Sequence, residues 1–291
     1  MIWRFVHIVF LMFTLVSCNQ QVEENVPPNL NWIEVEGGSF EFGSDDGLEQ
    51  EKPAIPMNVQ SFYLSSTEVS NQMFADFVEK TGYVTDAEES GGGSVFSDKW
   101  EFIEEASWRH PKGLNSSIDG RMDHPAVMVS YNDAQAYCKW TGGRLPTEVE
   151  WEYVSKRTFA SSSKKNIWTG DFPSDNTGKD GFVETAPVTA YEADSEGFHQ
   201  LRGNVWEWCE DSYNFEIHDK WQMFNDSTQR TNLGSSFDPL KNTDDSLRVI
   251  KGGSFLCHPD NCTGYLPYAR QSAAQSEAFF HIGFRVAKDR R

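Results

Sequence analysis

Three short segments of the chain carry helix signals, and most of the remainder has no sustained helical or strand periodicity. Residues 70–82 open on a capping serine, carry apolar side chains at helical spacing and end at a glycine. Residues 130–142 repeat this arrangement. A third helix opens at Thr147, where Glu150 completes a capping box. Regular structure is therefore expected only in short elements joined by long loops.

The strand signals are equally short. Residues 40–42 and 59–64 alternate apolar and polar side chains, which is typical of half-buried strands. Residues 171–181 and 225–246 lack periodicity, and the 22 Gly and 12 Pro of the chain favour turns and loops. Long structured loops in a compact domain are usually functional or held by something such as a metal ion. We therefore predict one α+β, loop-rich domain over residues 32–291.

The first residues differ in composition from the rest of the chain. Residues 5–16 are largely apolar, a stretch shorter than the about 20 residues of a membrane span but suited to a signal peptide. They lead into Leu-Val-Ser-Cys, which resembles the bacterial lipobox, where Cys18 is acylated. The alternative is an ordinary secretory signal with an incidental cysteine. We expect residues 1–17 to be a signal peptide. Residues 18–31 would be a lipid-anchored, flexible tether on the extracytoplasmic side of the bacterial envelope, in the periplasm or at the outer membrane.

Acidic residues dominate the charge, with 44 Asp and Glu against 25 Lys and Arg and a formal net charge of -19. Binding to nucleic acid or to anionic lipid requires clustered basic side chains, so this composition disfavours both. A solvated acidic surface explains most of the charge, and some carboxylates could hold calcium. We expect a monomer that does not bind nucleic acid.

Cys257 and Cys262 enclose the most informative hexapeptide of the chain, Cys-His-Pro-Asp-Asn-Cys. Its Pro259-Asp260 pair suits the centre of a type I turn, which would fold the two sulfurs back toward each other. Converging thiolates make a soft site, selective for Cu(I) or another thiophilic ion, to which His258 could add a donor. They can equally form a local disulfide. The spacing alone leaves a structural disulfide and a redox or metal site open.

Other segments allow both functional and structural interpretations. Residues 203–208 combine an amide, a carboxylate and backbone carbonyls, which suits calcium, although two core Trp beside a surface Glu explain them equally. Residues 171–180 are rich in Asp and Asn but lack the EF-hand spacing. Arg144 and Arg270 fit either buried ion pairs or substrate contacts. Cys138 lies on the apolar face of a predicted helix, which favours a buried, inert thiol.

A set of longer motifs follows one another along the chain: GGSFEFGSDD, WRHP, RLPTEVEWEY, GNVWEW, RVIKGGSF and GFRVA. Through them the chain resembles the formylglycine-generating enzyme (sulfatase-modifying factor) family over nearly its whole length after the tether. Several of these motifs mark a wider superfamily in which many members are not oxidases. The C-x4-C that follows KGGSF, formed by Cys257 and Cys262, is the pair found in members that make formylglycine.

The resemblance implies a fold, a reaction and a copper site. The fold would be a loop-rich variant of the C-type lectin fold. The reaction would oxidise the cysteine of a C-x-P-x-R motif in an unfolded sulfatase polypeptide to Cα-formylglycine, with O2 as the acceptor. Cu(I) would be held by Cys257 and Cys262. Ser254 and Trp206 would line the active site, and Arg270 would lie near it.

Calcium ligands are also implied by the resemblance. The first site would use the Asn166 side chain, the Ile167 carbonyl, the Asp180 carboxylate and the Phe182 carbonyl. The second would use the Gly203 and Val205 carbonyls, Glu207 and Gln200, where the family usually has Asn or Asp. Both stapling disulfides of the animal enzymes are missing. Val286 stands at the position of the partner of Cys138, and Val154 and Pro267 occupy both positions of the second pair. The resemblance assigns no role to Cys209. Stability is therefore expected to come from the aromatic core and calcium.

Two other interpretations remain beside the oxidase. The first is a non-catalytic, lectin-like binding or scaffolding lipoprotein, in which Cys257 and Cys262 are dispensable or permanently disulfide-bonded. The second, an iron-dependent enzyme that forms C–S bonds, fits poorly because its H-x3-H-x-E signature is absent from the sequence. P-loop, GxSxG, HExxH and dinucleotide-binding motifs are absent as well, so a hydrolase or a nucleotide enzyme is also a poor fit.

Overall fold

A computed structural model describes residues 30–161, 164–222 and 246–290. The expected signal peptide, the lipidation site Cys18, most of the tether and nearly all of loop 225–246 lie outside the described residues. Leu30, near the end of the expected tether, is already buried in the core. None of the helices in the described segments is long and apolar enough to cross a membrane.

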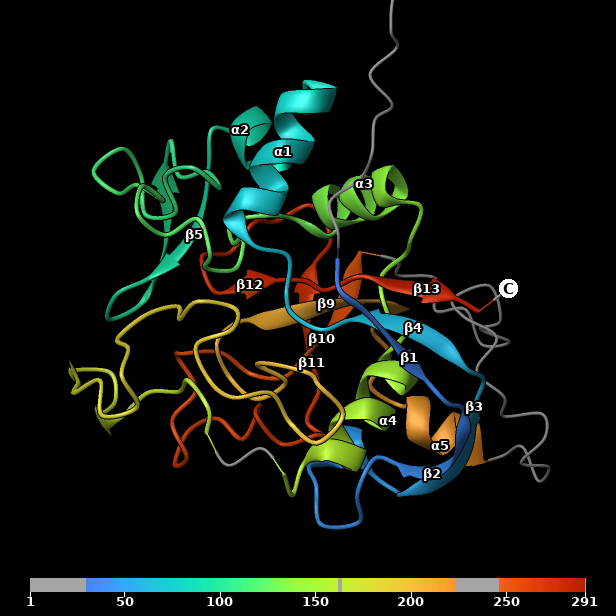
Figure 1. The fold of residues 1–291 in the computed structure, drawn as a ribbon. Coiled ribbons are helices and arrows are strands. Elements are labelled where there is room, and N and C mark those ends of the chain that lie inside the picture. The colour runs from blue at the N-terminus through green and yellow to red at the C-terminus, as the bar shows by residue number, and fades with distance from the viewer. Residues whose placement is uncertain (1–29, 162–163, 223–245, 291) are drawn as a thin grey trace, which may run out of the picture.

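Short strands and helices alternate with long loops throughout the described chain, as Figure 1 shows. The elements in chain order are β1 (Trp32–Val35), β2 (Gly38–Phe42), the 3-10 helix η1 (Glu49–Glu51), β3 (Ile55–Val59), β4 (Phe62–Ser65), α1 (Asn71–Thr81), α2 (Asp86–Ser90), β5 (Gly92–Phe96), β6 (Trp100–Glu104), α3 (Tyr131–Thr141), α4 (Glu148–Thr158), β7 (Gly170–Asp171), β8 (Asp175–Asn176), β9 (Trp206–Ser212), α5 (Ile217–Gln222), β10 (Leu247–Lys251), β11 (Gln271–Ala274), β12 (Ile282–Gly283) and β13 (Ala287–Asp289). The predicted α+β, loop-rich class is confirmed.

The three predicted helices form with their predicted caps. The Ser70 hydroxyl accepts a hydrogen bond from the backbone of α1, which ends at Gly82 with a left-handed φ of 68°. α3 begins and ends in the same way over residues 130–142. Thr147 and Glu150 form the capping box of α4. The apolar faces of α1 and α3 pack in one core cluster and that of α4 in a second.

The prediction of one continuous strand over residues 59–64 is wrong. β3 ends at Val59 and pairs with β2, whereas β4 begins at Phe62 and pairs with β1 and β13. Between them Gly37 N donates a hydrogen bond to Ser61 Oγ at 3.0 Å. The chain passes there from one sheet to another. The alternation of apolar and polar side chains continues across this break, so the pattern alone does not reveal it. The expected loop 171–181 contains the last residue of β7 and the two-residue strand β8, and the rest of it has no regular secondary structure.

One four-stranded sheet, in the order β11-β10-β9-β12, positions the candidate site (Figure 1). β10 runs antiparallel to both β9 and β11, so its carboxyl end at Lys251 lies beside the start of each. β12 runs parallel to β9 and pairs Ile282 with Trp206. Segments that lie far apart in the sequence therefore meet at one edge of this sheet.

Aromatic side chains supply most of the largest buried residues of the core. Fully buried large side chains include Trp108, Trp151 and Trp208. Cys138 and Cys209 are buried free thiols, and burial raises the pKa of each well above its ordinary value. The burial predicted for Cys138 is confirmed, and a buried thiol with a raised pKa is expected to be inert.

Candidate active site

The loop that follows β10 folds its two cysteines together. Asn261 N donates a hydrogen bond to His258 O at 2.9 Å and closes the predicted turn centred on Pro259-Asp260. The Cα atoms of Cys257 and Cys262 lie 4.9 Å apart, and their sulfurs are joined as a disulfide. The disulfide that the spacing allowed is therefore present. On reduction, the same two sulfurs would be adjacent soft donors, a set that suits Cu(I).

Two glycines let this loop pack against the sheet edge. Gly253 has a φ of 73°, and a Cβ there would lie 2.7 Å from Tyr265 N. A Cβ on Gly264 would lie 2.5 Å from the Trp206 ring and 3.1 Å from Cys262 Sγ. Only a residue without a side chain fits between these groups, so Trp206 lies directly behind the cysteine loop.

The cysteines lie in a groove of about 620 Å³. Ser254 and Trp206, both predicted to line the site, line this groove and are almost fully buried. Ser254 Oγ accepts a hydrogen bond from Leu256 N at 3.2 Å. Cys257 is only 1% exposed, whereas Cys262 is partly exposed.

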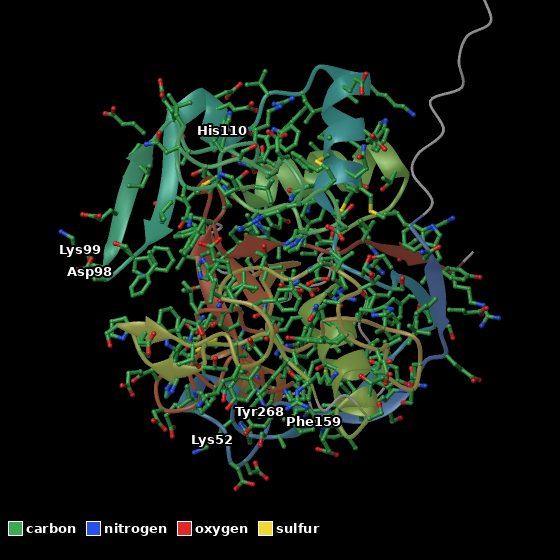
Figure 2. The ribbon with its side chains drawn as sticks, turned by 60° about the vertical axis from the view of Figure 1, so that its left-hand side comes forward. Lys52, Asp98, Lys99, His110, Phe159 and Tyr268 are labelled. Atoms are coloured by element: carbon green, nitrogen blue, oxygen red, sulfur yellow. A yellow bond between two sulfur atoms is a disulfide. The ribbon has the colours of Figure 1, made fainter. Side chains whose placement is uncertain are left out.

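Aromatic side chains from two hairpins form another part of the lining. Phe96 and Trp100 come from the β5–β6 hairpin and flank its turn, which carries Asp98 and Lys99 (Figure 2). Phe96 stacks on Phe172 of the β7–β8 hairpin, with ring centroids 5.7 Å apart and planes within 9°. Sequence reasoning missed these residues, because an aromatic residue in a short strand usually belongs to the core.

Arg270 also lines the groove, but its guanidinium is committed to a buried ion pair. Its Nε lies 2.7 Å from Glu148 Oε1 and its Nη2 lies 2.9 Å from Oε2. Burial alone would lower the pKa of Arg270, yet the Glu148 carboxylate outweighs it and raises that pKa. Arg144 forms a similar pair with Glu150 at 2.7 Å. The ion-pair interpretation therefore describes the contacts of both arginines.

The four residues of the first expected calcium site come together. Asp180 Oδ2 accepts a hydrogen bond from Ile167 N at 2.9 Å, and Oδ1 accepts one from Phe182 N at 3.2 Å. Asn166 Oδ1 is enclosed and has no hydrogen-bond partner within the described residues. A buried oxygen of this kind is satisfied by a hard cation. The residues therefore fit calcium.

The second expected set fits calcium less well. The Glu207 carboxylate accepts hydrogen bonds from Arg285 Nε at 2.6 Å, from Arg285 Nη2 at 2.7 Å and from Trp151 Nε1 at 2.8 Å. Gln200 Oε1 is enclosed and unpartnered in the part of the chain that the structure describes, while its Nε2 donates to Pro187 O at 3.2 Å. Arg285 therefore supplies the positive charge that compensates the buried Glu207 carboxylate, a part that calcium would otherwise play.

Sequence reasoning also missed Glu68, a fully buried carboxyl beside the second set. Its Oε1 accepts a hydrogen bond from Asn204 Nδ2 at 2.8 Å. Burial, and then the charge of Glu207, raises the pKa of Glu68 to about 8. Among the described residues no three His, Cys, Asp or Glu side chains converge as a metal cluster. Amide and carbonyl oxygens would therefore have to complete any calcium site.

Proteins of known name match this chain in sequence over most of its length. A family model described as "Sulfatase-modifying factor enzyme 1-like domain" matches residues 19–290. The formylglycine-generating enzyme of Mus musculus is 38% identical over 88% of this chain and 74% of its own length. That of Streptomyces coelicolor is 35% identical over 88% of both chains. The "Inactive C-alpha-formylglycine-generating enzyme 2" of Bos taurus is 30% identical over 89% of this chain and 88% of its own length.

Solved structures match the described fold over most of its length. PvdO from Pseudomonas aeruginosa has a TM-score of 0.61 and 22% identity, over 89% of this chain and 94% of that one. CarF has a TM-score of 0.52 and 18% identity, over 89% and 98%. At such identities the likeness shows the fold alone. It confirms the expected loop-rich variant of the C-type lectin fold.

Proposed function

The chain belongs to the sulfatase-modifying factor enzyme 1-like family, and from this premise we propose that it oxidises an active-site cysteine of sulfatases to Cα-formylglycine. The target would be the cysteine of a C-x-P-x-R motif in an unfolded sulfatase polypeptide. The observation that carries the proposal is the position of Cys257 and Cys262, adjacent to each other in a groove beside Trp206 and Ser254. At about 620 Å³ the groove has room for a short peptide segment.

The stoichiometry of the reaction defines what the site must supply. Conversion of the thiol-bearing methylene of cysteine to an aldehyde by O2 takes up two electrons and two protons and releases hydrogen sulfide and water. An external thiol would provide these electrons. Cu(I) bound by the sulfurs of Cys257 and Cys262 would supply the activation of O2. The protein's own residues would hold the target thiol beside that pair, with Trp206 behind the loop and the aromatic lining limiting the access of water.

Calcium is proposed at the first set of ligands only. A cation bound by Asn166 and Asp180 would tie two parts of the long loop between α4 and β9 together. The pairing of Arg285 with Glu207 would serve the corresponding purpose at the second set. These contacts would replace the stapling disulfides that the chain lacks.

A lipid anchor on Cys18 is proposed for localisation in the bacterial cell envelope. The lipobox-like Leu-Val-Ser-Cys sequence supports this proposal. Metabolic labelling with palmitate should mark the wild-type protein and should be absent from Cys18→Ala. Equal labelling of both proteins would contradict the anchor.

A non-catalytic binding or scaffolding role is the second candidate function. It is favoured by the relative named inactive and by the disulfide between Cys257 and Cys262. Titration of free thiols under mild reductant, followed by Cu(I) titration, separates the candidates. The oxidase should release both thiols and bind one Cu(I) per chain. The scaffolding protein should keep the disulfide and bind no copper at these residues.

A further inference from the structure

His281 brings an imidazole ring into the lining of the groove. It directly precedes β12, whose pairing with β9 places Ile282 beside Trp206. Trp206 N donates a hydrogen bond to His281 O at 3.0 Å. The backbone of His281 is thereby fixed next to the residue that lies behind Cys262. Its position in the groove is set by a sheet rather than by a loop, which gives the ring a defined place.

Aromatic side chains surround the ring of His281. Its centroid lies 4.9 Å from that of Trp100, 6.0 Å from that of Phe279 and 5.9 Å from that of Phe280. The residue is 8% exposed, and burial lowers the pKa of the imidazole to about 3. The ring is therefore neutral at physiological pH, with one N–H group and one lone pair to satisfy.

The surroundings of the two ring nitrogens differ. Nδ1 of His281 is enclosed and makes no hydrogen bond to any residue that the structure describes. An orphaned buried N–H is rarer than an orphaned acceptor, so we assign the proton to Nε2. Nε2 is then the donor left to meet whatever occupies the groove. A phenylalanine would pack against Trp100 equally well and leave no buried polar atom, so packing does not account for a histidine here.

We propose that His281 binds the target polypeptide by donating a hydrogen bond from Nε2 to one of its backbone carbonyl oxygens. The inference rests on the proposed function, which places an extended peptide segment in this groove. Every residue of an unfolded client offers a carbonyl, and an extended segment lying on an aromatic surface leaves its carbonyls without partners. A single fixed donor beside Trp206 would set the register of the peptide and so bring the target thiol to Cys257 and Cys262.

The test compares the wild type with His281→Phe and His281→Asn. The ligand is a fluorescent C-x-P-x-R peptide in which serine replaces the cysteine, so that binding is measured without turnover. His281→Phe should weaken binding about tenfold, because one hydrogen bond is lost, and should leave the Tm unchanged or raised. His281→Asn keeps an amide donor and should stay within about threefold of the wild type. With the cysteine peptide the Phe variant should raise KM and leave kcat nearly unchanged.

Three results would overturn the inference while leaving the proposed function intact. The first is wild-type affinity and KM in His281→Phe. The second is an equal loss in both variants with a lowered Tm, which would indicate a structural role. The third is a loss confined to kcat, which would place the ring in the chemistry. If the wild type neither binds nor converts its peptide, the inference falls together with the proposed function.

Discussion

Arg270 and Glu148 form a two-pronged ion pair behind the groove, with N–O distances of 2.7 and 2.9 Å and almost no exposure to solvent. Lys251 lies in the same interior, 2.9 Å from Glu152 and 3.8 Å from Glu148. These pairs join α4 to the end of β10 and to the residue that precedes β11. These buried ion pairs therefore connect the segments that form the groove.

Breaking this pair from one side should destabilise the protein severely. Glu148→Gln leaves the Arg270 guanidinium buried without compensation, and we expect the free energy of unfolding to fall by about 3–5 kcal/mol. The double variant Glu148→Met, Arg270→Met should lose less, because it leaves no unpaired charge. Urea denaturation measures the free energy of unfolding of both variants. As a control, Glu49→Gln removes one partner of an exposed ion pair, and its free energy of unfolding should stay within about 0.5 kcal/mol of the wild type. A double variant as unstable as the single one would show that charge burial is not the cause.

Calcium should stabilise the protein through Asp180. At a calcium concentration about a hundredfold above the Kd, binding contributes about 2.7 kcal/mol, so chelation with EDTA should lower the Tm by about 5–10 °C. Asp180→Ala should begin at the lower Tm and should not respond to EDTA. Glu207→Gln should be destabilised with and without calcium, because Arg285 loses its partner. Thermal unfolding of the three proteins with and without EDTA measures these effects. A wild-type Tm that does not change with EDTA would contradict stabilisation by calcium.

Acid should destabilise the protein partly through His218. Its Nδ1–H donates to Pro53 O at 3.1 Å and its ring stacks on Phe42, while burial, followed by the charge of Arg270, lowers the pKa to about 4. The unfolded chain takes up a proton near pH 6.5 and the folded protein only near pH 4. The contribution of His218 is therefore complete above about pH 6.5 and is lost as the pH falls from about 6.5 to about 4.

His218→Phe keeps the stacking on Phe42 and removes this titration. The difference in unfolding free energy between variant and wild type should shift by about 2–3 kcal/mol in favour of the variant between about pH 7.5 and about pH 4.5. Urea titrations at the two pH values give that difference directly. A pH-independent difference would mean that His218 titrates normally in the folded protein.

Gly264 should tolerate no side chain. The added methyl group of Gly264→Ala would meet the Trp206 ring at 2.5 Å and Cys262 Sγ at 3.1 Å, so one of them must move. We expect a loss of about 1–3 kcal/mol in stability and at least about a tenfold loss of peptide conversion. Thr263→Ala, a neighbouring change that adds no atoms, serves as the control. Conversion by Gly264→Ala at the wild-type rate would show that the position of Trp206 does not matter.

Local features of the structure were accessible from the sequence, and long-range pairings were not. The caps over residues 70–82 and 130–142, and the turn at Pro259-Asp260, are encoded within a few residues, so pattern reasoning finds them. The break between Val59 and Phe62 depends on which strands pair across the molecule, and alternation continues through it.

The same limit applies to the site. Cys257 and Cys262 stand out because two thiols at short spacing have few functions. Glu68 and His281 look like ordinary polar residues in the sequence, and only the structure shows that each has a buried atom without a hydrogen-bond partner among the described residues. Arg270 lines the groove that contains the two cysteines, but its orientation depends on Glu148, a residue 122 positions away in the sequence.

We propose that Cys257 and Cys262 together carry the oxidation of a target cysteine. The measurement is conversion of a C-x-P-x-R peptide in air by reduced, Cu(I)-loaded protein with an added thiol, read as aldehyde by mass spectrometry. Wild type and the buried-thiol control Cys138→Ser should convert the peptide, whereas Cys257→Ser and Cys262→Ser should remain folded and give no aldehyde. The proposed oxidation by these cysteines is contradicted if the wild type leaves intact a peptide that a known formylglycine-generating enzyme converts, or if either serine variant matches the wild type.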